Sequence, residues 1–458
     1  MLDLSLGEIA RIVGGRQHGR DVVVSGGAYV DSREPVDGGL YVALAGERVD
    51  GHLYADGAHA VLGSRPTTPP TVVVDDVTVA LGRLARAVVD RLPADVLALT
   101  GSQGKTSTKD LLAHVLGESS VATRANNNNE LGVPLTVLRA DETTERLLLE
   151  MGARGVGHIA YLCEIAPPTV AAVLNVGTAH VGEFGGVEAI AAAKGEIVEA
   201  LPATGTAVLN ADDPRVAAMA ARTAATVLTF GEHADVRWRD VTLDALGRAR
   251  FELGHDGLWA PVALQVTGEH QVANAAAAAA MALAVGLPLD GPDGIAARLS
   301  TAEAASPWRM EVGERADGLL VLNDSYNANP ASMRAALDAV RALGRERPGR
   351  TIAVLGEMRE LGDEHDAAHA EVGGAASGVD VVVVVGDAAA GIADGARAAG
   401  VGEVIVTAGR DDALAWVREN AGAGDAVLVK ASRGVALEVL AAALLADRPQ
   451  APEEGDRP

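Results

Sequence analysis

The sequence is poor in cysteine and has no long uninterrupted apolar run. Its 458 residues hold one cysteine, Cys163, so a disulfide framework is excluded, and we expect a cytoplasmic setting in which this thiol is a small buried side chain. The start of the chain has no basic segment followed by an apolar core, so we expect no signal peptide. The longest apolar stretch, 272–289, is mostly alanine and is interrupted by Asn274, Gly286 and Pro288, which predicts a packed helix and no membrane insertion.

Positive charge is also scarce. The chain carries 62 acidic and 38 basic residues, a net charge of −24, which argues against a nucleic-acid binder because there is no basic stripe to release counterions. Lysine differs from arginine in donor geometry and in its ability to lose a proton, so each lysine here is a candidate for a role that needs an amine. The four lysines are Lys105, Lys109, Lys194 and Lys430. The length is sufficient for roughly two to four domains.

The clearest chemistry lies in residues 96–111, VLALTGSQGKTSTKDL. The apolar run predicts a buried strand, the glycine-framed segment Gly101–Gly104 a tight loop, and Lys105 the first turn of a helix. The N–H groups of such a loop bind phosphate, the lysine neutralises it, and the following hydroxyl binds magnesium. Leu99 stands where the longer G-x-x-x-x-G-K-[ST] pattern has glycine, so this is the shorter G-x-x-G-K-T form, and a chance turn is the alternative. The residues predicted to bind ATP here are Gly101, Ser102, Gln103, Gly104, Lys105, Thr106 and Ser107.

Three further polar residues are candidates to converge on this loop. Glu150 closes the run RLLLE, His180 follows AAVLNVGTAH, and Lys194 lies on the predicted helix AIAAAKGEIVEA. Ligands of parallel α/β sheets bind at the carboxyl ends of the strands. Magnesium prefers oxygen ligands, which favours Glu150 together with Thr106. Lys194 either neutralises phosphate directly or is converted by carbon dioxide to a carbamate that can bind metal, and sequence chemistry leaves both open.

Strand-like and helix-like segments alternate along the chain, which predicts an α/β protein of three domains. We predict that residues 1–93 form a small N-terminal α/β domain that binds substrate. Residues 94–304 predict a central P-loop domain with a mostly parallel sheet, and residues 305–458 a C-terminal Rossmann-like domain with a second parallel sheet. The expected strands of the last two domains lie near 146–151, 170–176, 205–210, 351–355, 381–385, 403–406 and 426–430. A linker is expected near 300–307.

Other polar residues have both a binding role and an ordinary alternative. His270 and Asn274 are four residues apart and lie on one face of a predicted helix, where the asparagine amide offers the donor and acceptor that an adenine edge requires. Helix capping is the alternative. Ser32 and Arg33, in a polar loop of the first domain, are plausible anion contacts, but a solvated turn is equally consistent with them.

The chain also resembles the Mur ligases of bacterial cell-wall synthesis along nearly its whole length. The matching segments, in order, are DSR and DGH near the N-terminus, TGSQGKTSTKDL, TRANNNNELGVPLT, LEMGARGVGHI, NVGTAHVGEFG followed by AAAKGEI, GEHQVANA, NDSYNANPASM, LGEMRELGDEHDAAH and VLVKASRG. Within the family, DSYNANP and the asparagine-rich loop are similar to the members that add D-alanyl-D-alanine to UDP-N-acetylmuramoyl-tripeptide. The Asp-Asn-Pro-Arg motif typical of the members that add diaminopimelate or lysine is not found. Two positions depart from the family pattern: Asn127 replaces a common aromatic residue, and His158 stands where an acid is usual.

This resemblance implies an ATP-dependent ligase that uses one or two Mg²⁺ ions. The implied catalytic residues are Lys105, His180 and Lys194, the last at the position that is carbamylated in the family. The implied metal ligands are Thr106, Glu150, His180 and carbamylated Lys194. The implied ATP contacts outside the phosphate loop are His270, Asn274, Arg309 and Asp324. The implied contacts to the UDP-sugar peptide are Ser32, Arg33, Asn126, Asn128 and Asn129. The resemblance leaves the dipeptide contacts open, and Tyr326, Asn327 and Asn329 are the candidates for them.

The reaction implied by the resemblance proceeds through an acyl phosphate. The tripeptide carboxylate attacks the γ-phosphorus of ATP, and the amine of D-alanyl-D-alanine then displaces phosphate. We expect a monomer whose third domain closes over the second, with hinges near 300–307, to shield the intermediate from water. The alternatives are a Mur ligase that adds a single amino acid, a folylpolyglutamate-type ligase and, outside the ligases, a P-loop kinase or a nucleotide-gated binding protein.

Overall fold

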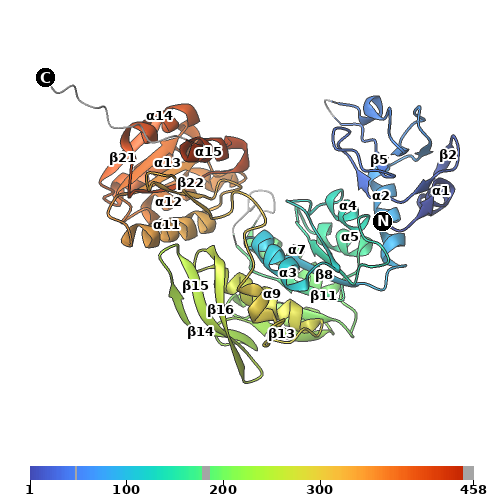
Figure 1. Cartoon of the computed structure of the whole chain (residues 1–458), viewed down its shortest axis with the longest axis horizontal. Coiled ribbons are helices and arrows are strands. Elements are labelled where there is room, and N and C mark those ends of the chain that lie inside the picture. Colours follow the sequence, from blue (N-terminus) through green and yellow to red (C-terminus); the bar gives the residue numbers. More distant parts are fainter. Residues whose placement is uncertain (47–48, 178–185, 447–458) are drawn as a thin grey trace. The chain divides into compact units, whose positions relative to one another are not determined.

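The computed structural model describes residues 1–46, 49–177 and 186–446 (Figure 1). The chain divides into two compact units, and the first consists of residues 1–176, 188–237 and 276–289. Both units combine helices with parallel-rich sheets, which confirms the predicted α/β class. The domain boundaries at residues 93 and 304 stay a prediction. In the described part of the chain, no helix has the length and apolar character needed to cross a bilayer.

The N-terminal region of the first unit is built from short strands and helices. They are β1 (Leu4–Ser5), α1 (Leu6–Val13), β2 (Arg16–His18), β3 (Val23–Val24), β4 (Ala28–Tyr29), β5 (Leu40–Val42), the 3-10 turn η1 (Gly51–Tyr54), β6 (Ala60–Gly63), β7 (Thr71–Val73) and α2 (Val77–Val89). Strands β4, β5, β6 and β7 pair in parallel, and β2 is antiparallel to β7 at the edge. Helices α1 and α2 pack together, and each buries one apolar face, on which Leu6 and Leu84 are fully buried.

The rest of the first unit alternates strands and helices as predicted. The elements are β8 (Asp95–Thr100), α3 (Lys105–Leu116), β9 (Ser120–Ala122), α4 (Gly132–Val137), β10 (Arg146–Glu150), α5 (His158–Ile165), β11 (Val170–Val173), α7 (Val187–Glu199), β12 (Thr206–Asn210), α8 (Pro214–Ala217), η2 (Ala218–Arg222) and β13 (Thr226–Phe230). Their strands pair in parallel in the order β13-β12-β11-β8-β10-β9. The carboxyl end of β8 therefore lies between those of β10 and β11. Cys163 on α5 is buried, which raises the pKa of its thiol to about 12 and confirms its packing role.

The alternation predicted up to residue 304 fails between residues 236 and 267. This segment forms β14 (Val236–Leu243), β15 (Arg248–His255) and β16 (Leu258–Thr267), with β15 antiparallel to β16. Buried and exposed side chains alternate along β15 and β16, as expected for a sheet with one solvated face. The helix predicted over 272–289 is α9 (Gln271–Ala284), in which Ala275–Ala282 are fully buried, and α10 (Ile295–Leu299) follows. Residues 300–307 contain no helix or strand, as the expected linker requires.

The C-terminal part of the second unit is a doubly wound sheet. Its elements are β17 (Glu311–Glu314), β18 (Leu320–Asn323), α11 (Pro330–Arg345), β19 (Thr351–Gly356), η3 (Gly362–Glu364), α12 (His365–Ala375), β20 (Val381–Val385), η4 (Asp387–Ala389), α13 (Ala390–Ala398), β21 (Glu403–Thr407), α14 (Arg410–Asn420), β22 (Ala426–Lys430), η5 (Arg433–Val435) and α15 (Glu438–Ala446). The strand order is β17-β18-β22-β19-β20-β21, and only β17 is antiparallel to its neighbour. The predicted Rossmann-like sheet is confirmed.

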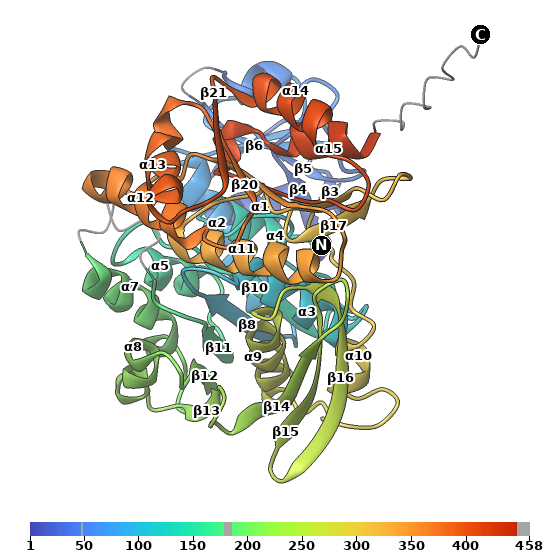
Figure 2. The ribbon, with the colours of Figure 1, turned by 90° about the vertical axis from the view of Figure 1, so that its left-hand side faces the viewer.

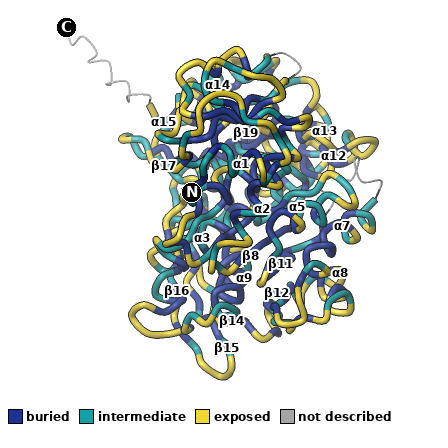
Figure 3. Tube along the Cα trace, turned by 90° about the vertical axis from the view of Figure 1, so that its right-hand side faces the viewer, coloured by how far each residue is buried: buried dark blue, intermediate teal, exposed yellow. Residues whose placement is uncertain are grey.

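Alternate residues of these strands enter two separate cores. Leu322, Leu355 and Leu428 pack with α11, α12 and α13 on one face, whereas Val354 and Val429 pack with α14 and α15 on the other. Figure 2 shows α12 and α13 on the opposite side of this sheet from α14 and α15. Strands covered on both faces carry continuous apolar runs, and β8, β11 and β19 are accordingly buried in Figure 3.

Candidate active site

The predicted phosphate loop connects β8 to α3 and is braced by the segment that follows β11. The N–H of Gln103 donates to Oδ1 of Asn175 (3.0 Å), and Nδ2 of Asn175 donates to the Gln103 carbonyl (3.1 Å). The N–H of Ser102 donates to the Asn175 carbonyl (3.1 Å). Gly104 has φ +79° at the start of α3, a conformation that favours glycine. The loop is therefore fixed in shape at a helix N-terminus, where an anion is favoured.

Glu150 ends β10, beside β8, and is 1% exposed. Oγ1 of Thr106 donates to Oε2 of Glu150 (3.0 Å), and Nδ2 of Asn128 donates to Oε1 (2.8 Å). Among the residues that the structure describes, no basic side chain forms an ion pair with this carboxylate. A buried carboxylate without a cation is unfavourable, and oxygens of this kind are the ligands that Mg²⁺ prefers. The donor set therefore fits a magnesium ion.

The two lysines of this site have different surroundings. Nζ of Lys105 donates to the Gly101 carbonyl (2.6 Å), which places its ammonium over the phosphate loop. Lys194 on α7 is 6% exposed and, within the described residues, forms no hydrogen bond or ion pair. Burial, with a smaller effect from the positive charge of Lys105, lowers the pKa of Lys194 well below its usual value. A neutral amine is the nucleophilic form that reacts with carbon dioxide. His180 lies outside the described residues.

The asparagine-rich loop brings one of its predicted binding residues to this site. Asn128 contacts Glu150 as described above, whereas Asn126 is exposed. Asn129 is used within the loop, since its Oδ1 accepts the N–H groups of Leu131 and Gly132 (3.2 and 2.9 Å) at the start of α4.

The two positions that depart from the family pattern are also placed. Asn127 is exposed in the same loop. Nε2 of His158 lies 3.1 Å from Oε2 of Glu130, which pairs this histidine with an acid from a neighbouring segment.

Ser32 and Arg33 lie in a turn of the N-terminal region. Arg33 is exposed and forms an ion pair with Asp31 (2.6 Å), and its hydrogen bonds lower the pKa of Asp31 to about 2. Ser32 is half-buried. The structure thus contains the solvated turn that the sequence allowed, with a guanidinium at its surface that a phosphate can also use.

In the second unit, the predicted helical pair of His270 and Asn274 is only partly correct. His270 lies one residue before α9 begins, and its carbonyl accepts the N–H of Asn274 (3.4 Å), so it stands at the N-terminal end of the helix. Asn274 is buried, and its Nδ2 donates to Oε1 of Gln271 (2.8 Å). A Cβ at Gly268, which has φ +110°, would come within 2.4 Å of the His270 ring. The absence of a side chain at Gly268 therefore leaves the space that the imidazole occupies.

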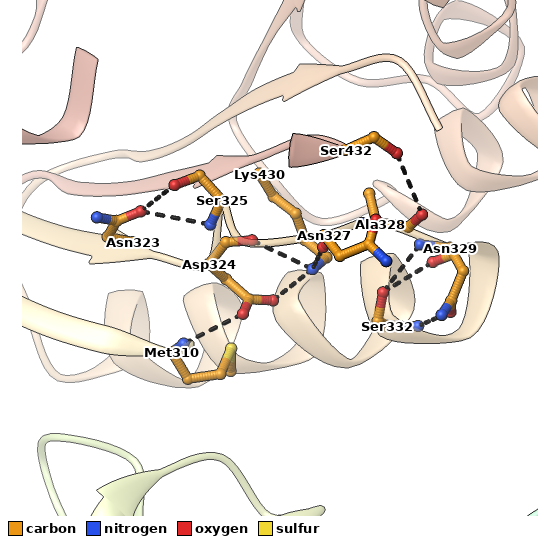
Figure 4. Close-up of polar contacts among 10 residues, drawn as sticks. All are labelled: Met310, Asn323, Asp324, Ser325, Asn327, Ala328, Asn329, Ser332, Lys430 and Ser432. Carbon is orange, nitrogen blue, oxygen red and sulfur yellow. Dashed lines mark hydrogen bonds and ion pairs between the residues drawn. The ribbon is translucent and has the colours of Figure 1, made fainter. Parts of the chain in front are cut away.

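Arg309, Asp324 and Tyr326 meet at the carboxyl end of β18. The guanidinium carbon of Arg309 lies 4.1 Å from the centre of the Tyr326 ring. Nε of Arg309 is buried and has no hydrogen-bond partner within the described residues. Oδ1 of Asp324 accepts the N–H of Met310 (3.1 Å), and Oδ2 pairs with Lys430 (Figure 4).

Asn327 and Asn329, predicted to bind the dipeptide, have local structural partners. Oδ1 of Asn327 accepts the N–H of Ala328 (2.8 Å). Asn329 is the N-cap of α11, where its Oδ1 accepts the Ser332 N–H (2.9 Å) and its own N–H donates to the Ser332 hydroxyl (3.0 Å). Figure 4 shows this reciprocal pair beside the Asp324–Lys430 contact. Because the Asn329 side chain already caps the helix, it could bind the dipeptide only while it also makes this hydrogen bond.

Comparison with known proteins identifies the family. Residues 99–282 match the Mur ligase middle domain, and residues 308–433 match the Mur ligase, glutamate ligase domain. The chain is 43% identical to the UDP-N-acetylmuramoyl-tripeptide–D-alanyl-D-alanine ligase of Mycobacterium bovis, with 98% of each chain covered. The chain belongs to the Mur ligase family.

Solved Mur ligase structures agree with this fold. A MurF structure from Acinetobacter baumannii is 31% identical, with a TM-score of 0.86 over 97% of this chain and 99% of that one. The MurF of Thermotoga maritima, solved in complex with ADP, is 31% identical, with a TM-score of 0.79 over 91% and 96% of the two chains. The three-domain Mur ligase fold predicted from the sequence is thereby confirmed.

Sequence reasoning missed two residues that shape the site of this Mur ligase. Asn175 braces the phosphate loop from the segment that follows β11, and its position five residues before His180 in NVGTAH was the available signal. Lys430 was singled out as one of the four lysines but received no role, because its partners lie 106 and 103 residues earlier in the chain.

Proposed function

We propose that this Mur ligase uses ATP to join D-alanyl-D-alanine to UDP-N-acetylmuramoyl-tripeptide, giving UDP-N-acetylmuramoyl-pentapeptide, ADP and phosphate. The observation that carries the proposal is the buried oxygen site of Glu150 and Thr106 at the phosphate loop, over which the Lys105 ammonium lies. The M. bovis relative with this activity in its name is similar along almost the whole chain, which supports the choice of substrates.

The first chemical problem is charge, since ATP and the attacking carboxylate are both anionic. The loop N–H groups and the start of α3 bind the phosphates, and Lys105 neutralises them. The tripeptide carboxylate then attacks the γ-phosphorus in line, the bond from this phosphorus to the bridging oxygen breaks, and an acyl phosphate and ADP result. The amine of D-alanyl-D-alanine attacks its carbonyl carbon, and phosphate leaves.

Thr106 and Glu150 are the residues that would hold magnesium, which when bound neutralises phosphate oxygens as a Lewis acid. We propose that Lys194 is carbamylated and that His180 also belongs to the metal site. The lowered pKa and buried position of Lys194 support a carbamate, because the neutral amine can react and the product gains a ligand-forming oxygen.

The remaining assignments follow the same resemblance. His270, Asn274, Arg309 and Asp324 would contact ATP. The residues proposed for the UDP-sugar peptide and the dipeptide are Ser32, Arg33, Asn126, Asn128, Asn129, Tyr326, Asn327 and Asn329. We propose domains at 1–93, 94–304 and 305–458 in a cytoplasmic monomer.

The deciding experiment measures phosphate release from ATP with different acceptor pairs. One mixture contains UDP-muramoyl-tripeptide, with diaminopimelate or lysine as its third residue, and D-alanyl-D-alanine. The others contain UDP-muramoyl-dipeptide with diaminopimelate or lysine, and folate with glutamate. We expect release only in the first, with a pentapeptide by mass. Formation of ADP and a stable phosphorylated product, with no release of phosphate, would indicate a kinase instead. Release only in another mixture would reassign the substrates.

A further inference from the structure

Lys430 is a buried lysine to which the proposed reaction gives no part. It ends β22, the strand between β18 and β19, and is 1% exposed. Apart from its four lysines, the chain uses arginine for its basic Lys and Arg positions. A buried ammonium is costly unless every donor finds an acceptor, so its surroundings indicate why a lysine is kept here.

All three N–H donors of this ammonium have acceptors from one loop. Nζ lies 2.5 Å from Oδ2 of Asp324, 2.8 Å from the carbonyl of Asn327 and 3.3 Å from the carbonyl of Asp324 (Figure 4). The loop that follows β18 therefore wraps around a single cation. A compact ammonium can serve a carboxylate and two carbonyls in this way, whereas a planar guanidinium cannot.

The same contact reaches the segment that precedes β17. Oδ1 of Asp324 accepts the N–H of Met310 (3.1 Å), and the N–H of Tyr326 donates to the carbonyl of Trp308 (3.1 Å). Trp308 and Met310 have φ of +60° and +53°, a left-handed conformation that is unfavourable for non-glycine residues. Such a backbone persists only where its surroundings fix it.

Arg309 lies between these two strained residues. Its guanidinium stands over the Tyr326 ring, which belongs to the loop that wraps around Lys430. Two contacts therefore fix the position of Arg309. The N–H of its neighbour Met310 donates to Asp324, and its own guanidinium packs on the ring of Tyr326. Both depend on the loop between residues 324 and 327.

We infer that Lys430 is a positioning residue: its ammonium fixes the loop 324–327 and, through Asp324, the segment 308–310, so that Arg309 and Asp324 are presented to the nucleotide. The inference rests on the proposed function because it takes Arg309 and Asp324 as nucleotide contacts. The three N–H donors of Lys430 are all used within the protein, which leaves none for the nucleotide. The loss of Lys430 therefore acts through Asp324.

The test compares Lys430→Met with a matched variant of the same strand. Val427→Ala also removes buried side-chain volume from β22 and leaves the ammonium intact. We expect Lys430→Met to raise the dissociation constant for ADP and the KM for ATP on the order of tenfold or more, since small misplacements of binding groups are costly. Val427→Ala should lower Tm and leave both constants within about twofold. Lys430→Arg, which retains a charge, should also weaken ADP binding and serves if Lys430→Met does not fold.

A double-mutant cycle separates positioning from general stability. In an Asp324→Ala background, Lys430→Met should weaken ADP binding less than about threefold further, because the group through which it acts is already absent. Additive effects in the cycle would overturn the inference, as would wild-type ADP affinity in Lys430→Met or in Lys430→Arg. ADP binding does not depend on the acceptor substrates. Failure of the D-alanyl-D-alanine assay with intact ADP binding therefore rejects the substrate assignment alone.

Discussion

The four lysines show how strongly surroundings change one residue type. Lys105 donates to a loop carbonyl, Lys194 is buried without a partner in the described chain, and Lys430 has three acceptors. Lys109 is buried in an ion pair with Asp110 (2.8 Å). Their scarcity made all four worth following from the sequence. Their roles could not be assigned there, because acceptors and burial arise only when distant segments pack.

Replacement of Lys194 by arginine tests the proposed carbamate. Lys194→Arg retains a positive charge but cannot react with carbon dioxide, so we expect turnover to fall on the order of a hundredfold or more. Phosphate release in bicarbonate buffer measures this. Lys109→Arg, at the other buried lysine of the first unit, should retain most activity. Near-normal turnover of Lys194→Arg would exclude the carbamate.

Glu150→Gln should separate activity from stability. The neutral amide removes a buried charge that lacks a cationic partner in the described chain, and the Thr106 hydroxyl can turn to accept from it. We expect the free energy of unfolding without magnesium to be unchanged or to rise by about 1 kcal/mol, and activity to fall on the order of a hundredfold. Urea titration and phosphate release at several Mg²⁺ concentrations measure the two. A strong loss of stability would show that Glu150 is primarily structural.

At the scale of the element, the start of α11 combines a cap with a proposed binding loop. Asn329 and Ser332 form a capping box, with Pro330 at the first helical position. The spacing Asn-Pro-x-Ser was a readable signal of a helix start. From the sequence, this asparagine is a candidate for dipeptide binding, and the helix-start signal was not used.

Two variants of Asn329 distinguish these roles. Asn329→Ala should destabilise the second unit by about 1 kcal/mol, the usual cost of a lost N-cap. Asn329→Asp retains the capping oxygen and should keep the wild-type Tm. If the asparagine also binds the dipeptide, Asn329→Asp will raise the KM for D-alanyl-D-alanine at unchanged Tm. If both the Tm and the KM of Asn329→Asp match wild type, the residue is a cap only.

The elements differ in how well the sequence predicted them. Strands β20 and β22 were located to the residue, because buried parallel strands carry continuous apolar runs that end at polar loops. Strands β14, β15 and β16 were not predicted from the sequence. These three strands follow one another directly in the chain, but the segment was interpreted as part of the alternation of strands and helices. His270 was predicted to lie within the helix because the apolar pattern predicts that a helix is present but does not determine its first residue.

At the scale of the whole molecule, the net charge of −24 acts on anionic substrates. Long-range repulsion extends about 30 Å at low salt and about 8 Å at physiological salt. We therefore expect kcat/KM for ATP to rise severalfold when monovalent salt increases from about 10 to about 150 mM at constant free Mg²⁺, with kcat nearly unchanged. Stopped-flow binding of an ATP analogue checks the association rate directly. A falling kcat/KM would mean that the basic groups of the site dominate the field that the nucleotide meets.

The strand order of the second unit has a consequence for how the chain is made. β22 is the last strand in the sequence, yet it pairs with both β18 and β19. A ribosome therefore releases both neighbours, with their facing edges unpaired, long before the strand that joins them emerges. The six strands β8 to β13, which pair in parallel around the phosphate loop, are complete by Phe230. The nascent chain can therefore pair the parallel strands around its phosphate loop during translation. The last sheet can be completed only after β22 has been synthesised, and until then its unpaired strand edges are accessible to chaperones.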